Sequence, residues 1–196
     1  MKKTTLPLIL LLLASNLSLS GCFTAVAAGT ATTVAVSHDR RSAGTVVDDR
    51  MLELKALSKV NEMLKNDPDS HLSAVAYNGN ILLVGQASND SLKHDVESKI
   101  RDIPSVGRIY NEITIDEVIS PLVRSKDTWI TTKVKGNMVL ERYFDSTRVK
   151  VVTEDGIVYL MGLVTQKEED LAVDLARHVD GVKKVITLFE YTADSE

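Results

Sequence analysis

Cysteine, histidine and aromatic residues are all scarce in this chain of 196 residues. The only thiol, at Cys22, has no partner for an intramolecular disulfide, and one cysteine cannot by itself form a cysteine metal site. None of the four histidines has a carboxylate or a second histidine at ligand spacing, so we expect no metal centre and no bound cofactor. These four residues are His38, His71, His94 and His178.

Catalytic motifs are also missing. No Ser/His/Asp order accompanies a nucleophile elbow, and the glycine-containing stretch 79–85 lacks the Gly-Lys-Ser/Thr ending of a phosphate loop. Thr165 and Glu168 predict a capping box that opens a helix, and the acidic run 168–170 falls in its first turn, where it complements the helix dipole. We therefore predict that the protein is not an enzyme.

The charge balance argues against a nucleic-acid partner. Residues 23–196 carry 21 basic and 27 acidic residues, a net charge of −6. Nucleic-acid-binding domains instead present basic surfaces. The excess of acid is uneven, however, because residues 124–150 hold seven basic and three acidic residues.

The N-terminus has the pattern of an export signal. Lys2 and Lys3 precede an apolar run, residues 6–13, which is too short to span a bilayer. Leu19-Ser20-Gly21-Cys22 then matches a bacterial lipobox, although a plain signal peptide that contains a cysteine is the alternative. We predict a signal peptide over residues 1–21 and lipidation at Cys22. Phe23 stands where an inner-membrane retention signal usually has Asp, which favours the outer membrane, with the protein facing the periplasm.

The rest of the chain repeats itself after a Thr/Ala-rich stretch, residues 22–47, which we expect to be a flexible tether. Each copy predicts a helix, a β-hairpin, a second helix and a third strand. The hairpin turns are Asn78-Gly79 and Asp155-Gly156, both typical of tight two-residue turns. We expect Asp49 and Asp127 to be the N-caps of the first helices.

Glycines mark equivalent places in the two copies. Gly79 and Gly85 align with Gly156 and Gly162 at one offset of 77 residues, and all four are predicted to be structural. The fold class is therefore α+β, with two tandem αββαβ units. We expect these units at residues 48–116 and 127–192, joined by a linker over residues 117–126.

The order of helix, glycine-turn hairpin, helix, Gly-Val and strand resembles the BON domain. A lipobox followed by two such units resembles the dual-BON outer-membrane lipoproteins of Gram-negative bacteria, and the stretches 127–134 and 160–165 carry much of the likeness. The resemblance implies binding of anionic phospholipid through the first helix of the second unit. It also implies support of envelope integrity and enrichment at the division site.

In that helix, Ile130, Val134 and Met138 are expected to pack on the sheet, while a neighbouring row is displaced toward solvent. From the pattern alone, Trp129 either completes the core or faces a membrane interface. With the resemblance, the candidate lipid-binding residues are Trp129, Lys133, Lys135, Val139 and Leu140. Gly136 is a poor helix former within this surface.

A second function remains open. BON units also suit a periplasmic protein–protein adaptor for outer-membrane assembly or peptidoglycan remodelling, with exposed strand edges as docking sites. The first unit lacks the tryptophan and the basic excess, so we expect it to be a spacer or a partner surface.

Overall fold

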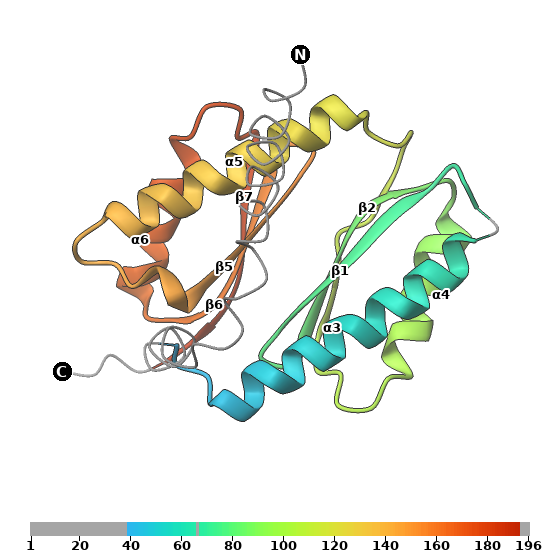
Figure 1. Cartoon of the computed structure of the whole chain (residues 1–196), viewed down its shortest axis with the longest axis horizontal. Helices are drawn as coiled ribbons and strands as arrows, with labels where there is room; N and C mark the ends of the chain where they lie inside the picture. The colour runs from blue at the N-terminus through green and yellow to red at the C-terminus, as the bar shows by residue number, and fades with distance from the viewer. Residues whose placement is uncertain (1–38, 66, 193–196) are drawn as a thin grey trace, which may run out of the picture. The chain divides into compact units, whose positions relative to one another are not determined.

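The computed structural model describes residues 39–65 and 67–192 (Figure 1). The signal peptide, Cys22 and most of the expected tether lie outside the described residues. The first repeat consists of α3 (Ala43–Leu64), β1 (His71–Tyr77), β2 (Asn80–Ala87), α4 (Asp90–Arg101), β3 (Ile109–Asn111) and β4 (Thr114–Ile115). The second consists of α5 (Pro121–Leu140), a 3-10 turn (Ser146–Arg148), β5 (Val149–Glu154), β6 (Ile157–Val164), α6 (Gln166–Arg177) and β7 (Lys184–Tyr191).

Each repeat forms its own mixed sheet, so the predicted αββαβ order is confirmed. In the first sheet β1 pairs antiparallel with β2, and β2 pairs parallel with β3 and β4. In the second sheet β5 and β6 are antiparallel, and β6 and β7 are parallel. Within each repeat the two helices cover one face of the sheet (Figure 1).

Both hairpins turn where the sequence predicts. Asn78 and Gly79 have φ values of 50° and 75°, and Asp155 and Gly156 have values of 46° and 72°. Two consecutive residues with positive φ give the tight turn that suits the twist of paired strands. The predicted capping box is also present. The Thr165 side-chain oxygen accepts from the Glu168 backbone N–H, and the Glu168 carboxylate accepts from the Thr165 backbone N–H.

The first helices begin earlier than the sequence predicts. Helix α3 is capped by Ser42 and α5 by Ser120, with Pro121 in the first turn. The expected N-cap roles of Asp49 and Asp127 are therefore wrong, since both lie inside helices. Part of the expected tether and part of the expected linker are helical, and the remaining domain boundaries stay predictions.

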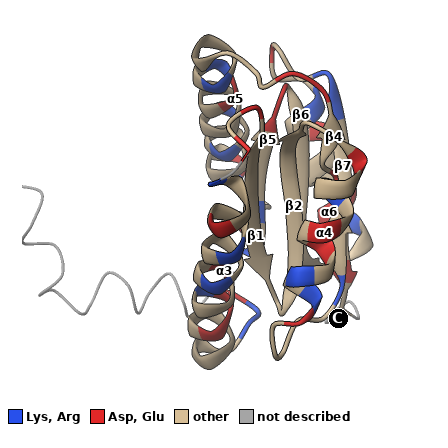
Figure 2. Cartoon of the chain, turned by 90° about the vertical axis from the view of Figure 1, so that its right-hand side faces the viewer, with Lys and Arg blue, Asp and Glu red and all other residues tan. Residues whose placement is uncertain are grey.

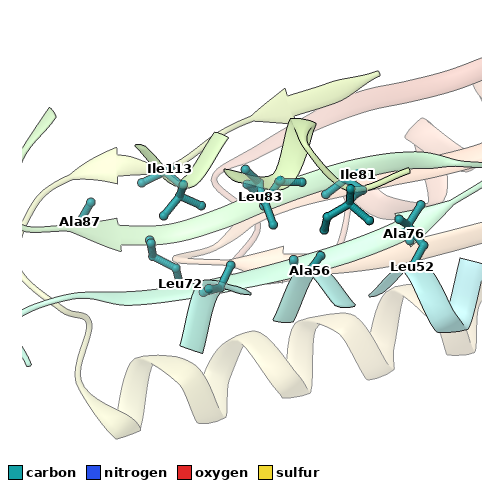
Figure 3. Packing of buried hydrophobic residues seen from close by; sticks show 13 residues of the cluster. Leu52, Ala56, Leu72, Ala76, Ile81, Leu83, Ala87 and Ile113 are labelled. Carbon is teal, nitrogen blue, oxygen red and sulfur yellow. The ribbon is translucent and has the colours of Figure 1, made fainter. Parts of the chain in front are cut away.

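Alternating side chains of the central strands belong to two different cores. In β2, Ile81 and Leu83 pack under the helices of the first repeat, as Figure 3 shows with α3 residues Leu52 and Ala56. The intervening Leu82 and Val84 face the second repeat. A strand buried on both faces has no polar alternation, which explains the unbroken apolar run 81–84.

The second repeat supplies the other half of the shared core. Tyr159 and Met161 of β6 cluster with Leu82, Val84 and Tyr77, and all five are almost fully buried. Polar contacts surround this cluster: the Tyr77 hydroxyl donates to the Arg148 carbonyl at 3.0 Å, and Lys150 Nζ lies 2.7 Å from Glu53 Oε2. The two repeats therefore share an interface as well as having separate cores.

Candidate functional site

Helix α5 exposes an apolar face. Its buried stripe is the expected one, with Ile130 3% exposed and Val134 and Met138 fully buried. Leu122, Trp129 and Leu140 are spaced by seven and eleven residues, two and three helical turns, so they lie along one line. These side chains are 68%, 47% and 84% exposed, and Val139 beside them is 67% exposed. Trp129 therefore faces solvent in part, and does not complete the core.

Basic residues flank this apolar face on both sides. Lys126 and Lys133, seven residues apart, lie along one edge, and Arg124 and Lys135, eleven apart, lie along the other. Figure 2 shows these cations as blue bands along α5, where Asp127 is the one acidic residue and is buried. An apolar stripe bordered by cations is the arrangement of a helix that lies in a membrane interface.

The structure separates two lysines that the sequence grouped together. Lys133 Nζ lies 5.5 Å from the centroid of the Trp129 ring, a cation–π contact. Lys135 points to the opposite side, where it lines a groove with Arg124 and His71 of the first repeat. Burial, and then the charge of Arg124, lowers the pKa of His71, so the groove's positive charge comes from Arg124 and Lys135.

A pocket of about 470 Å³ adjoins Trp129. Its apolar wall is formed by Val123, Trp129 and Ile130, and the charged side chains of Lys126 and Lys183 stand among its lining. Lys183 Nζ lies 2.7 Å from Asp155 Oδ1, so its charge is paired within the second repeat. Lys126 is the cation that α5 contributes to the pocket. The pocket extends the apolar surface of the helix toward the β5–β6 turn.

Buried Asp127 fixes the position of this part of α5. Its carboxylate accepts from the backbone N–H of Asp155 at 2.9 Å and of Gly156 at 2.8 Å, so the helix is bonded directly to the hairpin turn. Asp49 does the same in the first repeat, where it accepts from Asn78 and Gly79. We call each arrangement a turn clamp. The turn clamp was not predicted from the sequence, although each copy has an aspartate in its first helix 28–30 residues before its hairpin turn.

The glycines singled out by the sequence occupy tight positions. A Cβ on Gly85 would overlap the carbonyl oxygen of His71 across the hairpin, and a Cβ on Gly162 would lie 2.5 Å from the carbonyl oxygen of Arg148. Gly79 and Gly156 supply the positive φ of the turns. Gly162 therefore allows β5 and β6 to approach closely beneath α5 and α6.

Gly136 lies within α5 without interrupting it, and a Cβ placed there would have nothing within 4 Å. We expect Gly136→Ala to raise the free energy of unfolding by about 0.5–1 kcal/mol, because alanine loses less backbone entropy in a helix. Urea unfolding followed by circular dichroism measures this. Gly44→Ala in the first turn of α3 is the matched control, and an unchanged midpoint for Gly136→Ala would contradict the expectation.

Among residues 39–65 and 67–192, no group of three or more His, Cys, Asp or Glu side chains has the geometry of a metal site. The helices in this part of the chain are also too short or too polar to cross a bilayer.

Comparison with known proteins identifies the family. The BON domain family matches residues 48–117 and 126–193, one match for each repeat. The chain therefore belongs to the BON-domain proteins. The outer membrane lipoprotein DolP of Haemophilus influenzae is 39% identical over 181 residues, which cover 92% of this chain and 94% of that protein. The chain is accordingly a DolP-like outer membrane lipoprotein.

One further curated relative and one solved structure also match this chain. The 21 kDa hemolysin of Actinobacillus pleuropneumoniae is 38% identical over 78% of this chain and 79% of its own length. Among solved structures, CdsD, a structural protein of the type III secretion system of Chlamydia trachomatis, matches at 12% identity with a TM-score of 0.30, over 71% of this chain and 94% of that one. That score is too low to support an argument about function.

Proposed function

We propose that this outer membrane lipoprotein, acylated at Cys22, binds anionic phospholipid through α5. The observation that carries the proposal is the exposed line of Leu122, Trp129 and Leu140 between two basic edges. Apolar side chains gain free energy on leaving water, and each Lys or Arg near an anionic surface adds roughly 1 kcal/mol. The residues proposed to contact lipid are Trp129, Lys133, Lys135, Val139 and Leu140.

This surface has a role that an acyl anchor lacks. Lipidation holds the protein on a membrane but does not distinguish one lipid headgroup from another. A weak contact by α5 acts at high effective concentration once the anchor is inserted, so it can bias where the protein resides. Enrichment at the division site and support of envelope integrity would follow from such a bias.

Trp129→Glu is expected to weaken binding to anionic vesicles at least about tenfold, because it removes an aromatic contact and adds a negative charge. The assay is sedimentation of protein lacking residues 1–22 with phosphatidylglycerol-containing or pure phosphatidylcholine vesicles. The matched control is Met51→Glu, since Met51 of α3 lies two residues after Asp49 as Trp129 lies two residues after Asp127, and it is 50% exposed.

Binding of the native protein is expected to need the anionic lipid and to fall with added salt. Equal sedimentation with both vesicle types, or undiminished binding by the Trp129 variant, would contradict the proposed lipid site. A loss of the same size in Met51→Glu would instead indicate a nonspecific effect of added negative charge.

The adaptor function has one observation in its favour. Among the described strands, β7 pairs with β6 alone, which leaves the outer edge of an eight-residue strand open to another chain. Cross-linking in cells that captures one stoichiometric partner in both the native protein and Trp129→Glu would favour this function over lipid binding.

A further inference from the structure

The four residues before α3, Asp39–Ser42, contact both BON domains. We call this segment the strap. Arg41 binds the first domain: its Nη1 lies 2.7 Å from Asp49 Oδ2, and its guanidinium carbon lies 3.9 Å above the Tyr77 ring. Asp39 holds the same guanidinium through a second ion pair of 2.7 Å. The Arg41 side chain is only 11% exposed, so it is built into the domain surface.

Arg40 binds the second domain. Its Nη1 donates to the Leu163 carbonyl at 2.9 Å and to the Glu168 carboxylate, and its Nη2 lies 3.2 Å from Glu168 Oε1. Glu168 also accepts from Arg148 and from the Thr165 backbone. Burial alone would raise the pKa of Glu168, but the hydrogen bonds from Arg40, Thr165 and Arg148 lower it to about 2. The carboxylate therefore stays ionised near neutral pH.

The residues held by the two arginines, Tyr77 and Glu168, are linked to each other across the domain interface through Arg148. Tyr77, which Arg41 covers, donates to the carbonyl of Arg148, and Arg148 pairs with Glu168, which Arg40 binds. The contacts made by Arg40 and Arg41 thus close a ring of side chains through both domains. Arg41 neutralises the buried Asp49 of α3, whereas Arg40 binds a domain to which α3 does not belong.

We propose that Arg40 and Arg41 are positioning residues, which hold the end of the tether at the interface between the two BON domains. The lipidated N-terminus then leaves the folded part of the protein at a fixed point bonded to both domains. Because the tether is attached at this fixed point, the folded domains can place α5 against the membrane in only some orientations. This last consequence rests on the proposed function, whereas the attachment of the strap does not.

Trypsin offers a direct test, because residues 23–39 contain no Lys or Arg. The first bonds that trypsin cuts after the anchor are therefore those that follow Arg40 and Arg41. Protein beginning at Cys22 is coupled through its only thiol to an uncharged maleimide-bearing diacylglycerol in phosphatidylcholine vesicles. Release of the folded part into solution then measures how often the strap opens. No anionic lipid is present, so the result is independent of the proposed lipid site.

Glu168→Gln is expected to release the protein about tenfold faster, since it removes the charge that binds Arg40 while glutamine still forms a capping box. Arg40→Ala is expected to accelerate release as well, although it deletes one of the two cleavage sites, and Arg40→Lys is expected to lie between. The control is Glu97→Gln, which removes the partner of exposed Arg101 on α4.

The released fragment and the unfolding midpoint separate local opening from general destabilisation. The proposal expects new cleavage at the strap with the rest of the chain uncut. Equal release rates in all variants would overturn it, as would faster release accompanied by cleavage throughout the domains. Slower release by Arg40→Ala would also overturn it, because that outcome reflects only the loss of a trypsin site.

Discussion

Gly85→Ala is expected to lower the free energy of unfolding by about 4 kcal/mol, or to prevent folding of the first BON domain. Two costs coincide at this residue. Its φ of 119° is rarely adopted by residues with a side chain, and its Cβ would overlap the carbonyl of His71 on the neighbouring strand. Strained backbone and overpacking each cost about 1–3 kcal/mol. Urea unfolding followed by far-ultraviolet circular dichroism measures the change.

Two other glycines separate these costs and act as controls. Gly79 has a φ of 75°, but a Cβ there would make only an ordinary contact, 3.7 Å from the Ser105 carbonyl oxygen, so Gly79→Ala is expected to cost about 1–2 kcal/mol. Gly162 has the close contact without a positive φ, and Gly162→Ala is expected to cost about 1–3 kcal/mol. If Gly85→Ala proved no more destabilising than either control, the strands would be relaxing around the new methyl group.

Asp127→Ala is expected to lower the free energy of unfolding by about 3 kcal/mol. The carboxylate is 5% exposed and accepts two backbone N–H bonds from the β5–β6 turn. Hydrogen bonds to charged groups contribute about 1.5–3 kcal/mol each, and water entering from the adjacent pocket replaces part of the loss. The single tryptophan, Trp129, lies two residues away, so its fluorescence follows unfolding of this domain directly.

Matched variants distinguish the turn clamp from a general effect of charge. Asp127→Asn keeps one acceptor and is expected to cost about half as much as Asp127→Ala. Asp155→Asn removes the charge of an acid in the same turn whose partner is Lys183, keeps a residue type that tolerates its φ of 46°, and is expected to change stability by less than about 1 kcal/mol. Equal losses in Asp155→Asn and Asp127→Asn would show that the buried carboxylate has no special role.

The sequence predicts the elements whose causes are local. Asn78-Gly79 and Asp155-Gly156 form the predicted turns because their backbone preferences need no distant partner. Thr165 and Glu168 form their capping box within one helical turn for the same reason. The repeated glycines then align the two copies, which determines the order of strands and helices.

Long-range contacts account for what the sequence analysis missed. An aspartate near the start of an apolar helical pattern usually caps the helix, but Asp127 instead bonds to a turn 28 residues away. The strap depends on contacts at even greater separation, since Arg40 and Glu168 are 128 residues apart. The unbroken apolar run 81–84 was the one visible sign that the two domains pack together.

The candidate lipid site was predicted only in part from the sequence. Helical periodicity placed Val139 and Leu140 toward solvent but left Trp129 open between the core and the surface, and all three are exposed. Periodicity also places Lys133 and Lys135 well apart around the axis, yet the sequence analysis treated them as one basic group. Their different neighbours, the Trp129 ring and the groove with Arg124, emerged only from the folded chain.

The duplicated turn clamp separates the framework of each domain from its outer surface. Because a buried aspartate and a hairpin turn hold the first helix of each domain in the same place, the outward side chains are free to change without loss of the framework. Met51 and Trp129 occupy matching positions, two residues after their aspartates, yet differ in chemistry. One framework, present twice, therefore carries two outer surfaces of different chemistry.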